Sequence, residues 1–226
     1  MAADQVDPAA AARNLQALLF DWDNTLVDNW LSIVDAMNVT LMAMGHRPWD
    51  AAEARRRIRR SMRETFPLLF GESWQEAQRI FYERFEAAHL NALRPMPGVD
   101  AMLEQFRAEG LYLGVVSNKR GDLLRREAAH LGWERHFGRL VGAGDAPQDK
   151  PAVAPVELAL EGSGVTRGPT VWFVGDSPLD IDCARAAGCV AVLVGPADHA
   201  LDVVGQSLPD LRVDDCTMLV KLARPD

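Results

Sequence analysis

Hydrophobic and polar positions follow two different patterns along this chain of 226 residues. Residues 15–21 form a short apolar run that ends at an aspartate, which is typical of a buried strand. From residue 29 to residue 93, apolar side chains recur at helical spacing, as at Ile33, Met37 and Leu41. We expect four residues to divide this segment into several helices, namely Gly45, Pro48, Pro67 and Gly71.

Past the break at residues 95–98, short apolar runs alternate with helical segments that end at glycine. We expect strands over residues 111–117, 140–142, 171–174 and 190–194. We expect helices over residues 99–109, 122–131, 155–161 and 180–187. This alternation implies right-handed crossovers and a parallel sheet. The predicted fold is therefore α/β, a Rossmann-like doubly wound parallel sheet of residues 1–28 and 94–226, with an all-α insertion over residues 29–93.

Composition narrows the class of protein. The 24 Lys and Arg residues against 32 Asp and Glu residues give a net charge of −8, which argues against a general nucleic-acid binder. No apolar run reaches the roughly 20 residues that a membrane span needs, and the N-terminal residues lack the pattern of a signal peptide. Cys183, Cys189 and Cys216 match no zinc pattern. We therefore expect a cytoplasmic protein with no nucleic-acid or membrane partner.

Acidic side chains stand where predicted strands end, which is where open parallel sheets place their sites. Asp21 and Asp23 follow the first strand, and Asp176 follows the strand over residues 171–174. Clustered carboxylates repel one another unless a cation offsets their charge. Carboxylate oxygens suit Mg²⁺, which also shares its ligand sphere with phosphate oxygens.

Other strand ends carry groups that bind anions. Ser117, Asn118 and Lys119 offer a hydroxyl, backbone amides near a helix start and a positive charge, and Lys150 adds a second cation. A metal ion, a lysine and amides around one carboxylate suit phosphoryl transfer, in which positioning and charge stabilisation dominate. Each motif alone is common in turns and helix caps, whereas their joint occurrence at strand ends is specific.

Taken in order, these motifs resemble those of the haloacid dehalogenase superfamily of phosphohydrolases, in particular the phosphoglycolate-phosphatase-like branch with a helical C1 cap. Residues 21–28 match the first motif, DxDxTLxD, and residues 117–118, 150–151 and 175–180 match the other three. The sequence departs from the family at Asn24, where a glycine is usual, and at Pro155, which lies farther from Pro151 than expected. Asparagine tolerates unusual backbone angles, so we expect the first departure to do little damage.

The resemblance implies a catalytic role for three residues. Asp21 would be the nucleophile that forms an aspartyl-phosphate. Asp23 would be the general acid that protonates the leaving oxygen and then the base that activates water. Lys150 would hold the transferring phosphoryl group, helped by Ser117 and Asn118.

The resemblance also implies a Mg²⁺ cofactor. Its ligands would be Asp21, Asp176 and the backbone carbonyl of Asp23. Thr25 would support the first loop, and Asp180 would support the site from behind these ligands.

The helical insertion would be a cap that closes over the site and reads the leaving group. It carries a run of arginines in which Arg60 and Arg63, three residues apart, can share one helix face. One interpretation of this run is a solvated helix face. The other is that Arg60 or Arg63 pairs with a second anionic group of the substrate, such as a carboxylate.

The function that the resemblance implies is that of a Mg²⁺-dependent phosphoric monoester hydrolase acting on a small phosphorylated metabolite, with 2-phosphoglycolate as the best single substrate. A phosphomutase acting on a sugar phosphate would share all four motifs. A non-catalytic protein of the same fold is a further alternative, against which the presence of Asp21, Asp23 and Lys150 argues. The expected partner is a small phosphate ester, and the protein is expected to be a monomer or a homodimer.

Overall fold

The chain divides into two compact units in the computed structural model, which describes residues 8–58, 61–195 and 208–224. The core unit comprises Met1–Leu26 and Pro95–Asp226, and the helical unit comprises Val27–Arg94. The short strands β2 (Val27–Asp28) and β3 (Arg94–Pro95) pair where the chain passes between the units. None of the helices in these described ranges has the length and apolar character needed to cross a membrane.

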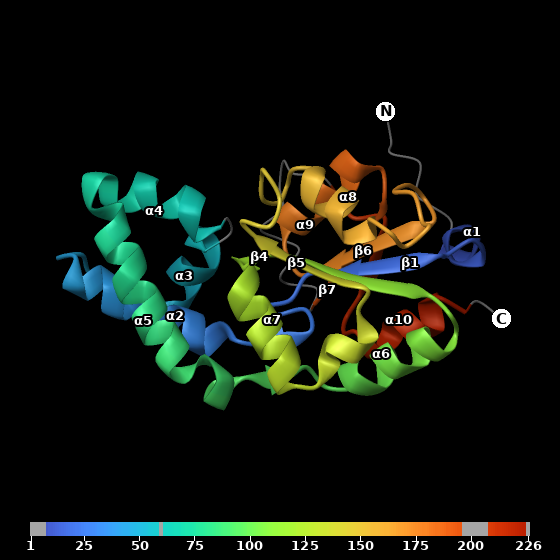
Figure 1. Cartoon of the computed structure of the whole chain (residues 1–226), viewed down its shortest axis with the longest axis horizontal. Helices are drawn as coiled ribbons and strands as arrows, with labels where there is room; N and C mark the ends of the chain where they lie inside the picture. The colour runs from blue at the N-terminus through green and yellow to red at the C-terminus, as the bar shows by residue number, and fades with distance from the viewer. Residues whose placement is uncertain (1–7, 59–60, 196–207, 225–226) are drawn as a thin grey trace. The chain divides into compact units, whose positions relative to one another are not determined.

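A six-stranded sheet forms the centre of the core unit, and every neighbouring pair of its strands is parallel. The strand order is β5-β4-β1-β6-β7-β8, so β1 lies in the middle (Figure 1). The strands are β1 (Ala17–Phe20), β4 (Tyr112–Arg120), β5 (Arg139–Ala143), β6 (Val171–Gly175), β7 (Val190–Val194) and β8 (Leu211–Val213). This sheet confirms the predicted α/β class.

Helices cover both faces of the sheet (Figure 1). One face carries α6 (Val99–Ala108), α7 (Gly121–His130) and α10 (Thr217–Leu222), and the other carries α8 (Ala154–Leu160) and α9 (Pro178–Ala187). The short α1 (Pro8–Arg13) and η2 (Trp133–His136) complete the described helices of this unit. Because side chains alternate along a strand, Leu19 and Phe173 pack toward α8 and α9, where they meet Val156 and Ile181. All four are buried, so the sheet is a rigid platform for the loops at its edge.

The helical unit is built from α2 (Trp30–Ala43), α3 (Ala51–Arg57), α4 (Met62–Phe70), η1 (Gly71–Ser73) and α5 (Trp74–Ala92), in agreement with the predicted helical insertion. Helix α2 packs along α5, and an aromatic cluster joins α4 to α5. In this cluster the rings of Phe66 and Phe81 lie 5.7 Å apart edge to face, and those of Phe81 and Phe85 stack at 5.9 Å. These contacts give the unit its own hydrophobic core.

Two predicted boundaries are wrong. Pro67 does not separate helices, because it lies inside α4, where its fixed φ suits the helix and one backbone hydrogen bond is lost. Strand β4 does not end at Ser117 but continues to Arg120, with a shift in its pairing with β5 between Val116 and Arg120. The Ser117–Asn118–Lys119 motif therefore lies on the irregular last part of a strand.

Candidate active site

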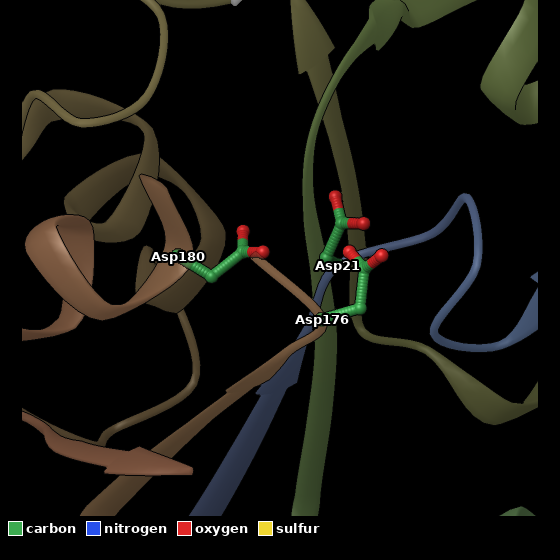
Figure 2. A group of neighbouring side chains, drawn as sticks. All are labelled: Asp21, Asp176 and Asp180. Carbon is green, nitrogen blue, oxygen red and sulfur yellow. The ribbon is translucent and has the colours of Figure 1, made fainter. Parts of the chain in front are cut away.

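Three carboxylates converge at the carboxyl edge of the sheet (Figure 2). Asp21 directly follows β1 and Asp176 directly follows β6, and these strands are neighbours. The backbone N–H of Asp21 donates to the carbonyl of Val174 at 2.9 Å, which keeps the two strand ends together. Asp180 comes from the first turn of α9. Each of the three residues offers one carboxylate oxygen, and these oxygens lie within 4.8 Å of one another.

The start of α9 fixes the side chain of Asp180. Its Oδ2 accepts hydrogen bonds from the backbone N–H of Ser177 at 3.1 Å and from the Ser177 hydroxyl at 2.6 Å, an arrangement that caps the helix. Gly175 makes room for it, because a methyl group there would collide with the side chain of Asp180. The buried Asp180 thus reaches the site with its other oxygen.

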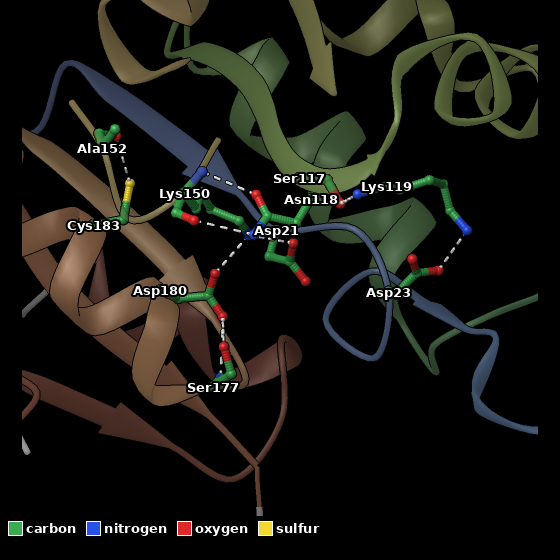
Figure 3. A network of polar contacts seen from close by, with 10 residues as sticks. All are labelled: Asp21, Asp23, Ser117, Asn118, Lys119, Lys150, Ala152, Ser177, Asp180 and Cys183. Atoms are coloured by element: carbon green, nitrogen blue, oxygen red, sulfur yellow. Dashed lines mark hydrogen bonds and ion pairs between the residues drawn. The ribbon is translucent and has the colours of Figure 1, made fainter. Parts of the chain in front are cut away.

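Lys150 joins two of the carboxylates (Figure 3). Its Nζ donates to Oδ1 of Asp21 at 2.5 Å and to Oδ1 of Asp180 at 2.7 Å. Asn118 holds the Lys150 backbone from both sides: its Oδ1 accepts from the Lys150 N–H at 2.9 Å, and its Nδ2 donates to the Lys150 carbonyl at 3.2 Å. The peptide bond between Lys150 and Pro151 is cis. Although 129 residues separate Lys150 from Asp21, the fold makes them direct partners.

Burial and crowding shift the pKa values of these groups. Burial raises the pKa of Asp21 to about 6. The positive charge of Lys150 lowers this pKa, but the negative charges of Asp180 and Asp23 raise it further, so Lys150 offsets the rise only in part. Burial, followed by Asp180 and Asp21, raises the pKa of Asp176 well above its usual range. Burial disfavours the charged form of Lys150, but Asp180 and Asp21 outweigh it and raise its pKa. Lys150 therefore stays positively charged, and its single charge is too little to keep all the neighbouring carboxylates ionised.

Asp23 lies outside the group of three and binds a different lysine (Figure 3). The Nζ of Lys119 is 2.9 Å from Oδ1 of Asp23 and 3.2 Å from Oε1 of Glu127. Burial disfavours the charge on Lys119, yet Asp23 and Glu127 outweigh it and raise its pKa. The other Glu127 oxygen, Oε2, accepts a 2.7 Å hydrogen bond from the indole N–H of Trp22. The third carboxylate of the cluster is Asp180. From the sequence, Asp180 was expected to support the metal ligands and not to stand among them.

The loop after β1 turns at Asn24, where the first motif of the family usually has a glycine. Asn24 has a φ of 65°, the left-handed conformation that glycine adopts most readily and asparagine tolerates. The N–H of Leu26 donates to the Trp22 carbonyl at 3.0 Å and closes the loop. Thr25 is 1% exposed, and its Oγ1 has no hydrogen-bond partner among the described residues. The buried thiol of Cys216 donates to the Thr25 carbonyl at 3.3 Å.

The remaining predicted site residues lie as follows. Ser117 is buried near the end of β4, and its Oγ accepts from the Lys119 backbone N–H at 3.2 Å. Arg63 is exposed on α4 of the helical unit. Arg60 falls outside the described residues.

Glu127 was not predicted from the sequence as a residue of the site. A signal for it exists, because Glu127 shares the buried stripe of α7 with Leu123, Leu124 and Ala128, and a buried carboxylate on an apolar stripe requires a partner. Lys119 was expected only as part of an anion-binding turn. Its burial follows from the continuation of β4, which carries the side chain into the core unit.

Comparison with known proteins agrees with this geometry. Residues 18–194 match the family model described as haloacid dehalogenase-like hydrolase. The chain belongs to this family. The match spans the three converging carboxylates and Lys150, and it confirms the haloacid dehalogenase-like family expected from the motifs. Together with the curated relatives described next, it also confirms the expected enzyme class, a phosphatase.

Individual relatives cover most of the chain. A phosphoglycolate phosphatase of Chromobacterium violaceum is 30% identical over 192 residues, which are 81% of this chain and 86% of that protein. One of Xylella fastidiosa (strain 9a5c) is 33% identical over 177 residues, 76% of this chain and 77% of that protein. A crystal structure described as a predicted phosphoglycolate phosphatase, from Haemophilus somnus 129pt, aligns with a TM-score of 0.80 at 23% identity and covers 93% of this chain and 99% of that chain. That structural likeness concerns the fold.

The donor set of this haloacid dehalogenase-like site suits a hard cation. Asp21, Asp176 and Asp180 supply only carboxylate oxygens, which Mg²⁺ prefers. The raised pKa values of Asp21 and Asp176 indicate that a further positive charge would stabilise their ionised forms. The residues present therefore fit the Mg²⁺ that is typical of the family.

Proposed function

We propose that the chain is a Mg²⁺-dependent phosphatase that hydrolyses a small phosphorylated metabolite through an aspartyl-phosphate on Asp21. The observation that carries this proposal is the position of the Lys150 Nζ, 2.5 Å from Asp21 and 2.7 Å from Asp180, beside the three clustered carboxylates. A fixed cation next to an anionic nucleophile suits an anionic phosphate ester, because it attracts the phosphoryl oxygens that the carboxylates would repel.

In the proposed reaction, a carboxylate oxygen of Asp21 attacks phosphorus, and the bond from phosphorus to the ester oxygen breaks. Asp23 gives a proton to that leaving oxygen. Asp23 then takes a proton from a water molecule, which attacks phosphorus and releases inorganic phosphate and the Asp21 carboxylate. Mg²⁺ bound by Asp21, Asp176 and Asp180, and by the Asp23 carbonyl, would neutralise charge on the phosphoryl oxygens.

Lys150, Ser117 and Asn118 would hold the phosphoryl group. Lys150 supplies the charge, and Asn118 fixes the backbone of Lys150 through its two hydrogen bonds. Ser117 supplies a hydroxyl beside the backbone N–H of Lys119. Thr25 lies buried in the loop that carries Asp21 and Asp23 and would support it.

The helical unit is proposed to be the cap that selects the leaving group. The exposed Arg63 is the described candidate for pairing with a carboxylate of the substrate. Arg63→Ala should then raise KM for 2-phosphoglycolate far more than KM for p-nitrophenyl phosphate, which has no carboxylate. Equal effects on both substrates would exclude this role.

We propose 2-phosphoglycolate as the substrate to test first, because relatives at 30% and 33% identity are named phosphoglycolate phosphatase. A second candidate is pyrophosphate, since a Clostridium perfringens protein that is 28% identical over 200 residues is named, provisionally, the pyrophosphatase PpaX. Phosphate release from both compounds and from a panel of sugar phosphates, with Mg²⁺ or EDTA, would separate these possibilities. Isomerisation of a sugar phosphate without phosphate release would indicate a phosphomutase instead.

A further inference from the structure

The core unit buries an ion pair beside Asp23 that the proposed reaction does not use. It consists of Lys119, at the end of β4, and Glu127, in the middle of α7. Their side chains are 5% and 0% exposed, and the Lys119 Nζ lies 3.2 Å from Glu127 Oε1. The same Nζ lies 2.9 Å from Oδ1 of Asp23 (Figure 3). Lys119 therefore bridges Asp23 and Glu127.

Glu127 is anchored to the loop that carries Asp21 and Asp23. Its Oε2 accepts the 2.7 Å hydrogen bond from Trp22, which lies between these two aspartates in the sequence. The Trp22 ring is fully buried and packs edge to face against Trp133, with ring centroids 5.8 Å apart. Glu127 therefore links the rigid body of α7 both to the first loop and to Lys119.

Stability alone is a weak reason for this arrangement. Moving a lysine and a glutamate out of water carries a desolvation penalty that can exceed their attraction, and apolar side chains of similar volume often serve a core as well. What apolar residues could not supply is the directed contact from Lys119 to Oδ1 of Asp23. Asp23 is the more exposed partner, at 17%, against 5% for Lys119.

We propose that Lys119, held by Glu127, is a positioning residue that keeps the Asp23 carboxyl where it exchanges a proton with the leaving oxygen. This inference rests on the proposed function. With Oδ1 held by Lys119, the proton passes from Oδ2 of Asp23 to the ester oxygen as the bond from that oxygen to phosphorus breaks. An error of about 1 Å in such a placement can lower a rate by roughly a hundredfold.

The test compares two esters that differ in how much their leaving oxygen needs a proton. p-Nitrophenolate is a stable anion and leaves without one, whereas unsubstituted phenolate is more basic and gains more from a general acid. The value of kcat/KM reports the step that phosphorylates the enzyme. The ratio of kcat/KM for phenyl phosphate to kcat/KM for p-nitrophenyl phosphate therefore measures proton donation, and a general loss of folded enzyme cancels from it.

The variants are Lys119→Met, which keeps most of the length of the side chain but not its charge, and the milder Glu127→Gln. Arg185→Met is the matched control, because it also removes the cation from a buried carboxylate, that of Asp210, whose Oδ2 accepts from the backbone N–H of Ala191 near the opposite end of the sheet. We expect the ratio to fall about tenfold in Lys119→Met and about threefold in Glu127→Gln, and to stay unchanged in Arg185→Met.

An unchanged ratio in Lys119→Met would overturn the proposal. If that variant does not fold, an unchanged ratio in Glu127→Gln would overturn it instead. Asp23→Asn separates this failure from failure of the proposed function. A lowered ratio in Asp23→Asn with an unchanged ratio in Lys119→Met rejects only the role of Lys119, whereas no effect of Asp23→Asn rejects the proposed role of Asp23 itself.

Discussion

The Lys150 Nζ lies 2.5 Å from Oδ1 of Asp21, and both side chains are buried. This contact joins the end of β1 to the loop before α8 and places a permanent cation beside the proposed nucleophile. Because the lysine also reaches Asp180 at 2.7 Å, it offsets part of the repulsion within the carboxylate cluster.

Lys150→Met should lower kcat for phosphate release by at least a hundredfold, since the variant removes the charge that stabilises the transferring phosphoryl group. Steady-state kinetics with p-nitrophenyl phosphate would measure this loss. Lys221→Met, at an exposed position on α10, is the matched control and should keep wild-type kcat. A kcat within threefold of wild type in Lys150→Met would contradict the assignment.

The acidic cluster should make stability depend on pH in the absence of Mg²⁺. The pKa of Asp21 rises from an ordinary value of 3.8 to about 6 on folding, so the folded chain keeps a proton that the unfolded chain has lost. The stabilising effect of that proton is complete below pH 3.8 and is lost as the pH rises through about 6. Urea unfolding in EDTA should therefore show a free energy of unfolding that falls across this window.

Asp21→Asn has no titratable group at this position, so its free energy of unfolding should fall less across the same pH range. Urea unfolding under the same conditions would measure this difference. Added Mg²⁺ should stabilise the wild type more at pH 7.5 than at pH 5, because protons compete with the metal for the carboxylates. A wild type whose response to Mg²⁺ does not change with pH would contradict this explanation.

Substitutions at Asn24 would test the left-handed backbone conformation in the loop after β1. Asn24→Ala should destabilise the protein by about 1 kcal/mol, because its φ of 65° brings the alanine Cβ too close to the following carbonyl. Asn24→Gly, which removes that conflict, should stay within about 0.5 kcal/mol of wild type in urea unfolding. Equal destabilisation by both changes would show that the asparagine side chain matters and the backbone conformation does not.

A substitution at Gly175 would test how Asp180 is positioned. The methyl group of Gly175→Ala would collide with the Asp180 side chain and displace it from Lys150. We expect a loss of about 2 kcal/mol of stability, typical of an overpacked site, and about tenfold weaker Mg²⁺ binding by calorimetry. The double variant Gly175→Ala/Asp180→Ala should lose less stability than the sum of the losses in the two single variants, because without the Asp180 side chain there is no collision. Strict additivity would rule the collision out.

Much of the fold was predictable because its signals are local. The all-apolar run at Val190–Val194 gave β7 at its observed bounds, and the strand ends before Asp21 and Asp176 followed from similar runs. Strand β8 was not predicted, because Leu211–Val213 is too short to show a period. The place of Asp180 in the cluster depends on its rotamer, which Ser177 fixes through hydrogen bonds that a sequence pattern does not show.

The rarity of lysine relative to arginine was a further indication of the site in the sequence. Only three of the 24 basic residues are lysines, at positions 119, 150 and 221. Two of these three, Lys119 and Lys150, are buried against carboxylates at the site. The use of lysine at these two buried positions, in a chain that otherwise uses arginine almost throughout, agrees with the need for a compact ammonium group there.

An aspartyl-phosphate on Asp21 can be detected directly. The enzyme with Mg²⁺ is mixed with excess p-nitrophenyl phosphate, quenched in acid within one turnover and mapped by mass spectrometry. Covalent catalysis by Asp21 predicts a phosphoryl group on the peptide that contains Asp21, together with a burst of p-nitrophenolate, and neither in Asp21→Asn. Phosphate release by Asp21→Asn at the wild-type rate, or turnover by the wild type with no phosphoryl group on that peptide at any time, would contradict it.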